Sequence, residues 1–166
     1  MRASYRRTPA RPVPRPRPCE AATERVNEPT AGAIRVVLAE EHRTLRRTLR
    51  ALLDAAEGVV VAVEVSDLES AMRGIQRHQP HVLILDLRLP LGERLGSIRA
   101  LSHTLPRVAI VMLTTEDSVE FARRVLDAGA RGVVLKHHAE DDLLDAIRAT
   151  AVGRAYVSPT VGRGGR

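Results

Sequence analysis

The chain has 166 residues, enough for one well-buried core but short for two, and its formal net charge of +6 raises the question of a nucleic-acid partner. The excess positive charge lies entirely in residues 1–18, which contain six arginines and no acidic residue, so the rest of the chain is electrically balanced. No apolar run approaches the roughly 18 residues that a membrane span requires. The single cysteine, Cys19, argues against an internal disulfide or a thiolate metal site. With only three aromatic residues, a base-stacking surface for nucleic acid is not expected.

Residues 1–32 are predicted to form a disordered arm rich in arginine and proline. Five prolines fall in the first 18 residues and large apolar side chains are almost absent, so this segment cannot offset the entropy cost of folding. The arm could bind polyanions through counterion release, or it could be a solvated tail or the product of a misassigned start codon. We expect residues 33–153 to form the single domain of a soluble cytoplasmic protein, and residues 154–166 to be a flexible tail.

Five short apolar runs are predicted to be buried strands, and each is followed by a segment with helical apolar spacing. The predicted strands are residues 34–39, 59–65, 81–86, 107–114 and 132–136. The first helix carries an apolar stripe that begins at Leu45, and it ends at Gly58. The second helix is predicted to begin with a capping box formed by Ser66 and Glu69.

The remaining helices follow the same pattern. The third is predicted over residues 93–104, the fourth begins at a second capping-box spacing of Asp117 and Glu120 and ends at Gly129, and the fifth spans residues 139–152 with an acidic first turn. Five strand-helix units with strands that are apolar throughout predict an α/β fold, a doubly wound five-stranded parallel sheet covered on both faces. In such sheets ligands bind beyond the carboxyl ends of the strands.

Polar residues stand at four of these strand ends: Glu40 and Glu41 after the first, Asp86 after the third, Thr114 at the end of the fourth and Lys136 at the end of the fifth. Two carboxylates about 4 Å apart repel by roughly 4 kcal/mol at an effective dielectric constant of 20, so positive charge is needed among them. Lys136 supplies one charge, and Mg²⁺, which takes one or two carboxylates and keeps several waters, would supply more. We therefore predict that Asp86 is a nucleophile toward phosphorus, with Thr114 donating a hydrogen bond to the phosphoryl group and Lys136 neutralising it.

Each of these residues also has a purely structural interpretation. Asp86 could cap a turn or helix, Thr114 could be a packing hydroxyl, Lys136 could be a solvated charge, and Glu40 with Glu41 could be the acidic first turn of a helix. Their joint occurrence at the ends of four different strands favours a functional site.

The stretches that carry these residues resemble a known family. "VVLAEEH", "HVLILDLRLP", "VMLTTED" and "DAGARGVVLK" make residues 34–152 similar to the receiver domain of two-component response regulators, which implies a flavodoxin-like receiver fold. The pattern "LTTED…DAGARG…LK" with the tail "GRAYVSP" is closest to receivers that normally carry a C-terminal helix-turn-helix of the LuxR type.

The resemblance implies a role for each residue and names a partner. Asp86 would be the phosphoacceptor, Thr114 the switch hydroxyl and Lys136 the phosphate-contacting amine, while Mg²⁺ would be held by Glu40, Glu41, Asp86 and the backbone carbonyl of Arg88. The phosphoryl donor would be a sensor histidine kinase. A homodimer or an output protein would use the face formed by the fourth helix, the fifth strand and the fifth helix. The chain would then be a phosphoacceptor that assists its own phosphoryl transfer and dephosphorylation, and not an enzyme.

Three features depart from the family pattern. Both acids of the Glu40–Glu41 pair are glutamates, whereas the family usually has at least one aspartate, and Val133 stands where the family commonly has an aromatic switch residue. No helix-turn-helix follows the last predicted helix, so we expect no direct DNA binding by this chain and an indirect role in transcription, or a truncated ancestor.

The other candidates for chemistry are six histidines, which we interpret as surface or loop residues because none pairs with a carboxylate at a metal-ligand helical spacing. They are His42, His78, His81, His103, His137 and His138. Neither a Gly-x-Gly-x-x-Gly nor a Walker-type loop is present, so no nucleotide cofactor is expected.

Three functions remain as alternatives. The first is a phosphoaccepting signalling domain, in which the charge added at Asp86 shifts a two-state equilibrium. The second is a degenerate, unphosphorylated receiver that acts as an interaction or dimerisation module, which the two glutamates and Val133 favour. The third, a hydrolase with an aspartyl nucleophile, needs a second acid close after Asp86, and Arg88 occupies that position.

Overall fold

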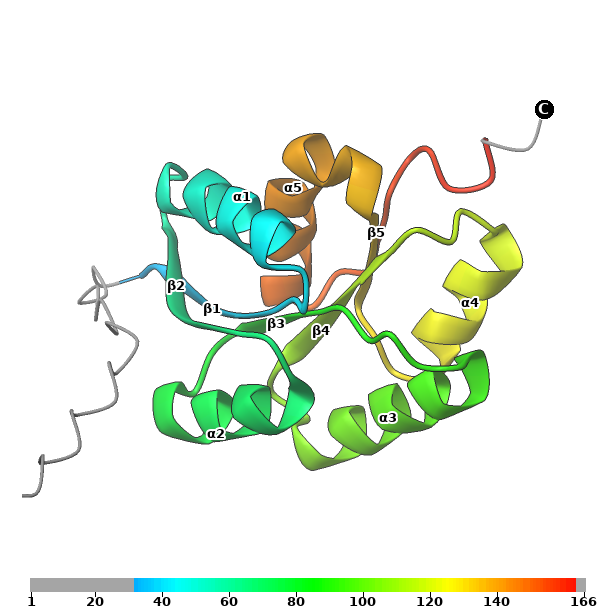
Figure 1. The fold of residues 1–166 in the computed structure, drawn as a ribbon, viewed down its shortest axis with the longest axis horizontal. Coiled ribbons are helices and arrows are strands. Elements are labelled where there is room, and N and C mark those ends of the chain that lie inside the picture. The colour runs from blue at the N-terminus through cyan, green and yellow to red at the C-terminus, as the bar shows by residue number, and fades with distance from the viewer. Residues whose placement is uncertain (1–31, 164–166) are drawn as a thin grey trace, which may run out of the picture.

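The computed structural model describes residues 32–163, so the predicted arm, apart from Gly32, and residues 164–166 lie outside the described residues. Figure 1 shows the strands and helices of the described residues. These residues contain one six-stranded sheet in which every neighbouring pair of strands is parallel. Its strands are β1 (Ile34–Ala39), β2 (Val59–Val65), β3 (Val82–Leu85), β4 (Ala109–Thr114), β5 (Gly132–Leu135) and β6 (Tyr156–Val157). The order across the sheet is β2-β1-β3-β4-β5-β6.

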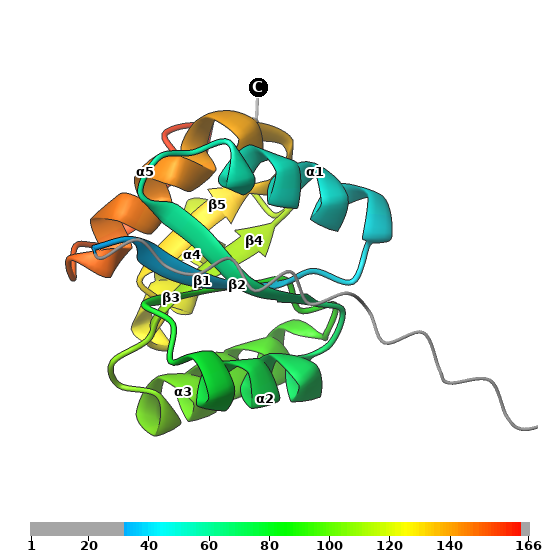
Figure 2. The same ribbon diagram turned by 90° about the vertical axis from the view of Figure 1, so that its left-hand side faces the viewer.

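Helices cover both faces of this sheet (Figure 2). They are α1 (Arg43–Asp54), α2 (Leu68–His78), α3 (Leu91–Thr104), α4 (Val119–Asp127) and α5 (Ala139–Ala151), and a 3₁₀ turn spans Lys136–His138. One face packs against α1 and α5, and the other packs against α2, α3 and α4. No helix in the described part of the chain is long and apolar enough to cross a membrane.

The apolar runs in the sequence follow from this three-layer arrangement. Along β1, Val37 and Ala39 join the core on the side of α2, α3 and α4, while Val36 and Leu38 join the core on the side of α1 and α5. All four side chains are buried, because successive residues of a strand point to opposite faces and both faces are covered. The prediction of a doubly wound parallel α/β sheet is confirmed.

The order of the strands decides where polar residues can gather. The first strand, β1, is followed by the edge strand β2 on one side, and the chain then returns to place β3 on the other side of β1. The direction of winding therefore reverses between β1 and β3, and such a reversal leaves an open crevice beyond the carboxyl ends of the two strands. Glu40 follows β1 directly and Asp86 follows β3 directly, so both residues stand at this crevice.

Two predicted helix starts are displaced by one residue. The N-cap of α2 is Asp67, whose side chain accepts a hydrogen bond of 2.7 Å from the backbone N–H of Ser70, and Ser66 is not the cap. The N-cap of α4 is Ser118, which accepts from the N–H of Phe121 at 3.2 Å. Both capping-box predictions were therefore wrong in position, because a second capping residue stood beside each predicted one and only the backbone path selects between them.

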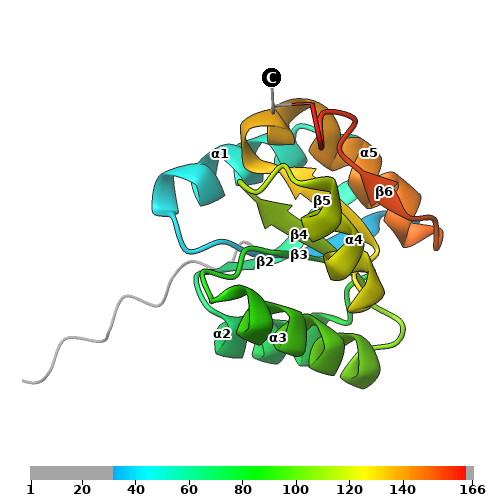
Figure 3. The same ribbon diagram turned by 90° about the vertical axis from the view of Figure 1, so that its right-hand side faces the viewer.

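The segment predicted to be a flexible tail contributes a sixth strand (Figure 3). Tyr156 pairs with Gly132 and Val157 with Val133, which places β6 at the open edge of β5. Ser158, which follows, is buried. Beyond it, the backbone N–H of Gly162 donates a hydrogen bond of 2.6 Å to the carbonyl of Asp117, in the loop before α4. The five-stranded prediction therefore missed one strand.

Candidate functional site

The carboxyl ends of β1, β3, β4 and β5 carry the predicted site residues to one region of the molecule. Asp86, Thr114 and Lys136 line the same pocket of about 860 Å³, together with residues from α1, α3 and the loops between. Glu40 is fully buried and contacts Lys136, one of the residues that line this pocket. The alternative that Glu40 and Glu41 form the acidic first turn of α1 is excluded, because α1 begins at Arg43 and has no acidic residue in its first turn.

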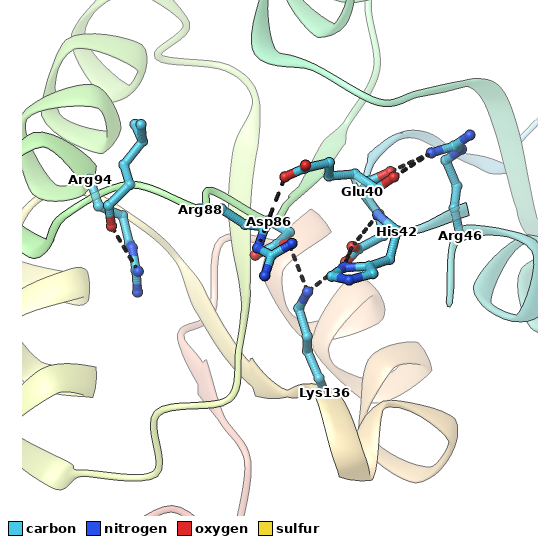
Figure 4. Close-up of polar contacts among 9 residues, drawn as sticks. Glu40, His42, Arg46, Asp86, Arg88, Arg94 and Lys136 are labelled. Carbon is cyan, nitrogen blue, oxygen red and sulfur yellow. Dashed lines mark hydrogen bonds and ion pairs between the residues drawn. The ribbon is translucent and has the colours of Figure 1, made fainter. Parts of the chain in front are cut away.

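Lys136 joins two of the predicted acids (Figure 4). Its Nζ lies 2.6 Å from Oδ2 of Asp86, to which it donates a hydrogen bond, and 2.9 Å from Oε2 of Glu40. The exposed fractions of these side chains are 15% for Lys136, 7% for Asp86 and zero for Glu40. Two carboxylates thus share one ammonium in a poorly hydrated site, which leaves one net negative charge among the three groups.

The carboxylate of Glu40 is held at one oxygen and incompletely satisfied at the other. Oε1 accepts a hydrogen bond of 2.9 Å from the backbone N–H of His42. Oε2 is close to Nζ of Lys136, but the angles are not those of a hydrogen bond, so this buried oxygen has a charge contact and no hydrogen-bond donor among the described residues. A guanidinium N–H of Arg46 donates to the Glu40 carbonyl at 2.6 Å, which fixes the backbone at this point.

Glu41 does not join Glu40 at the site. Its side chain is 59% exposed, and its Oε2 lies 4.0 Å from Nε of Arg88. The expected acidic pair therefore separates into one buried carboxylate beside Asp86 and one exposed carboxylate at the rim. The physical reason is that the two residues follow an extended strand, in which neighbouring side chains point in opposite directions.

His42 lies near the two acids, a position that the sequence analysis did not predict. One ligand atom from each of Glu40, His42 and Asp86 lies within 4.8 Å of the others, and Nδ1 of His42 is 3.6 Å from Oε1 of Glu40. The interpretation of His42 as a surface histidine agrees with its 56% exposed side chain, but helical spacing did not indicate that it lies near the two acids. The signal that could have found it is its position two residues after Glu40, where the chain leaves the strand and bends back over the carboxylate.

The donor set at this site fits a divalent cation. Two buried carboxylates lie together, and one of their oxygens, Oε2 of Glu40, lacks a hydrogen bond. A single ammonium offsets only half of their charge, so a small cation with oxygen ligands would complete the compensation.

Thr114 is almost fully buried at the end of β4 and lines the same pocket as Asp86. Its Oγ1 accepts a hydrogen bond of 3.0 Å from the backbone N–H of Glu116, which orients the loop after β4. Because the hydroxyl is used here as an acceptor, its own proton can still be donated to a group in the pocket.

Arg94 of α3 is a second residue that the sequence analysis did not select. It lines the pocket, donates to the carbonyl of Leu89 at 2.9 Å, and lies 5.5 Å from the ring centroid of Phe121 in α4. Arg94 therefore connects the loop after Asp86 with α4. The sequence pattern around Arg94 does not indicate that this arginine connects the loop and α4.

Comparisons with known proteins agree with this geometry. The family model described as the response regulator receiver domain matches residues 36–148. Among curated proteins, the chain is 33% identical over 125 residues to the oxygen regulatory protein NreC of Staphylococcus haemolyticus and 28% identical over 138 residues to the transcriptional regulatory protein DegU of Brevibacillus brevis. These alignments cover 75% and 83% of this chain but 58% and 57% of the two relatives, so the chain spans little more than half of their length.

Solved structures show the same likeness. The isolated receiver domain of RcsB from Salmonella enterica serovar Typhimurium, determined in the presence of the phosphomimetic BeF₃⁻, superimposes with a TM-score of 0.69 at 28% identity, covering 79% of this chain and 97% of that one. A LuxR-family two-component response regulator from Aurantimonas gives a TM-score of 0.70 at 27% identity, with 79% and 94% covered. The family match over residues 36–148, which is most of the chain, leads to one conclusion: this chain belongs to the response regulator receiver domain family.

Proposed function

We propose that this receiver domain accepts a phosphoryl group on Asp86 from a sensor histidine kinase, with Mg²⁺ bound beside it. Membership of the family makes the domain a component of two-component signalling, in which receivers are phosphoacceptors rather than typical enzymes. The observation that carries the assignment to Asp86 is its contact with Lys136, which also contacts the buried Glu40, in a pocket that Thr114 lines as well. The RcsB receiver, solved with a phosphate mimic, supports this choice of chemistry.

The proposed transfer is a displacement at phosphorus. An oxygen of Asp86 forms a bond to phosphorus while the P–N bond of the donor phosphohistidine breaks, and the departing imidazole keeps the electron pair of that bond and takes up a proton. Lys136 neutralises an oxygen of the transferred group, and the Thr114 hydroxyl donates a hydrogen bond to another. Because β3 is buried on both faces, it holds Asp86 rigidly at the pocket for this reaction.

Mg²⁺ would be held by Glu40, Asp86 and the backbone carbonyl of Arg88, and Glu41 would add negative charge from the exposed rim. When bound, the ion supplies charge stabilisation for the phosphoryl oxygens in transfer. The buried Oε2 of Glu40, which has a charge contact with Lys136 but no hydrogen bond among the described residues, supports this assignment.

Phosphorylation would alter the surface that partners read. The added charge favours contacts with Lys136 and Thr114, which lie at the starts of the segments leading to α5 and α4. A state in which these contacts form is therefore stabilised relative to one in which they do not, which is the requirement for a population shift. The output surface would be the face formed by α4, β5 and α5, used by a second copy or by another output protein.

The test uses the full chain, Mg²⁺ and acetyl phosphate, followed by intact-protein mass spectrometry. We expect a mass increase of one phosphoryl group, lost when Mg²⁺ is chelated and absent in Asp86→Asn. The matched control is Asp127→Asn, at an exposed aspartate of α4, which should be labelled as the unsubstituted chain is. An adduct that persists in Asp86→Asn, or no adduct on any variant, would contradict the proposal.

A second candidate is a receiver that signals without phosphorylation. It is favoured by Glu41, which lies away from the buried acids, and by Val133, a fully buried aliphatic residue where the resemblance predicts an aromatic switch. Under this function, Asp86→Asn would leave dimerisation or partner capture unchanged, while substitutions on the exposed surface of α4 or α5 would abolish it. Measuring self-association of phosphodonor-treated and untreated protein by sedimentation separates the two functions.

A further inference from the structure

We propose that the metal site of this receiver is a mixed oxygen and nitrogen site, in which His42 provides an imidazole ligand beside Glu40 and Asp86 and thereby favours a divalent first-row transition-metal ion such as Mn²⁺, Co²⁺ or Zn²⁺. This inference rests on the proposed function in one respect, since it concerns the same cation site. It goes further by assigning a third ligand and a chemical class of ion.

The first observation is the arrangement of ligand atoms. Glu40, His42 and Asp86 each place one ligand atom within 4.8 Å of the other two, a spacing that one small ion can bridge. Glu41, the residue expected to be the second acid of a magnesium site, is exposed and lies next to Arg88. The third ligand atom near the two buried carboxylates, which Lys136 bridges, is thus a histidine nitrogen in place of a third carboxylate oxygen.

The second observation is independent of that grouping. Glu40 is fully buried, and its Oε2 has no hydrogen-bond donor among the described residues even though it lies 2.9 Å from Nζ of Lys136. A buried carboxylate oxygen without a hydrogen bond is costly, and metal coordination is one of the few ways to compensate it. This oxygen belongs to the same carboxylate whose Oε1 lies 3.6 Å from the His42 ring.

The third observation concerns the freedom of the His42 side chain. His42 is the N-cap residue of α1, but its side chain makes no capping hydrogen bond, and its backbone N–H is already used to hold Oε1 of Glu40. The ring is 56% exposed at the wall of the pocket. It can therefore turn toward an ion without breaking a hydrogen bond that stabilises the fold.

The choice of ion follows from ligand chemistry. Mg²⁺ takes carboxylates, carbonyls and water in an octahedral shell and gains little from imidazole. Imidazole nitrogen suits the later first-row metals, whose affinities also rise along the series from Mn²⁺ to Cu²⁺. A site of carboxylates alone would already bind Zn²⁺ more tightly than Mg²⁺. We expect the imidazole of His42 to account for a large part of this difference in affinity.

The experiment titrates Co²⁺ into the full chain and follows its visible absorption, which responds to nitrogen ligation and to coordination number. All variants carry Cys19→Ser, so that the thiol of the arm cannot bind the ion. We expect His42→Ala to lower the Co²⁺ affinity by about tenfold or more, as losses of metal-supporting residues commonly do. The Mg²⁺ affinity, measured by competition, should stay nearly unchanged. His103→Ala, at an exposed histidine near the end of α3, is the matched control and should leave both affinities unchanged.

A second measurement needs no substitution at the site. In uniformly ¹⁵N-labelled Cys19→Ser protein, Zn²⁺ should shift the ring nitrogen resonance of His42 and leave that of His103 in place, while Mg²⁺ should shift neither. Equal losses of Co²⁺ and Mg²⁺ affinity in His42→Ala, or a His42 ring that does not respond to Zn²⁺, would overturn the inference.

The failure of this inference and the failure of the proposed function give different results. If acetyl phosphate labels Asp86 but His42 has no effect on metal selectivity, only the nitrogen ligand is wrong. If His42-dependent Co²⁺ binding is found but Asp86 is never labelled, the metal site stands and the phosphoacceptor role is wrong.

Discussion

Lys136 is the residue on which the electrostatics of the pocket depend. Its ammonium lies 2.6 Å from Asp86 and 2.9 Å from Glu40, and the side chains of these two acids are at least nine-tenths buried. A buried ion pair adds little stability compared with an apolar pair of the same shape, because desolvation offsets the attraction. Removal of one partner is different, since it leaves buried charge without compensation.

We predict that Lys136→Met lowers the free energy of unfolding by about 3 kcal/mol at neutral pH, because two buried carboxylates then repel without a cation between them. Urea denaturation monitored by circular dichroism measures the change. The double variant Lys136→Met with Asp86→Asn should recover part of the loss, since one of the two charges is gone. A divalent cation should stabilise Lys136→Met more than it stabilises the unsubstituted chain. Additive losses in the double variant would show that the three groups do not interact.

His81 is a second residue whose charge state matters for stability. Its Nδ1 accepts a hydrogen bond of 2.9 Å from the backbone N–H of Arg35, an arrangement that requires the neutral ring. Burial, together with the positive charge of Arg35, lowers the pKa of His81 from its usual 6.5. The unfolded chain therefore binds a proton more readily than the folded chain as the pH falls.

Because the pKa of His81 is lowered, we expect its contribution to the free energy of unfolding to be fully present above about pH 6.5 and to be lost as the pH falls through the pKa of the folded state. His81→Asn places a non-titrating oxygen where Nδ1 accepts, so it should reduce the loss of stability between neutral and mildly acidic pH. Thermal unfolding of both chains across that range measures the effect, with His103→Asn as the control. A variant whose pH profile overlays that of the unsubstituted chain would contradict this role for His81.

At the scale of elements, β6 is the strand that the sequence did not predict, and one side chain extends its pairing. The N–H of Ser158 donates to the carbonyl of Val133 at 2.9 Å, and the Oγ of Ser158 accepts from the N–H of Leu135 at 3.1 Å. The pairing of β5 with β6 ends at Val157, and the Ser158 hydroxyl takes the place of the backbone carbonyl that would accept the next hydrogen bond from β5. Because Leu135 immediately precedes Lys136, this bond also holds the end of β5 at the site.

We therefore predict that Ser158→Ala destabilises the domain by about 1–3 kcal/mol, since it leaves the buried N–H of Leu135 without an acceptor. Chemical denaturation measures the loss. Hydrogen exchange should show faster exchange at the Leu135 amide than in the unsubstituted chain. Ser97→Ala, on α3, serves as the control for removal of a hydroxyl. Unchanged protection at Leu135 would mean that the hydroxyl does not supply this bond.

Strands of four residues or more were predicted from their apolar runs, while the two-residue strand β6 was not. The strands at residues 34–39 and 59–65 were predicted with the bounds that β1 and β2 have, because apolar runs of six or seven residues that contain several β-branched side chains show no helical period. A two-residue strand such as β6 has no periodicity at all. It forms because β5 would otherwise expose an unpaired edge, and that edge exists only after the sheet has assembled.

At the scale of the whole molecule, the site exists because four segments far apart in the chain end at one edge of a parallel sheet. Glu40 and Lys136 are separated by most of the domain, yet they are in contact, since β1 and β5 point the same way with β3 and β4 between them. The strand ends alone were enough to predict that Asp86 and Lys136 meet with a glutamate and that Thr114 opens to the same pocket. They were not enough to predict which glutamate.

The sequence by itself determined the class of fold and the identity of the residues that gather at the strand ends, because apolar periodicity is local and parallel strands must place their carboxyl ends together. Only the tertiary structure decided that Glu40 turns inward while Glu41 turns outward, that His42 lies beside the buried carboxylates, and that Ser158 closes the ladder beside Lys136. These outcomes depend on the backbone path where a strand leaves the sheet, a path that is set by contacts between distant segments and has no periodic pattern in the residues themselves.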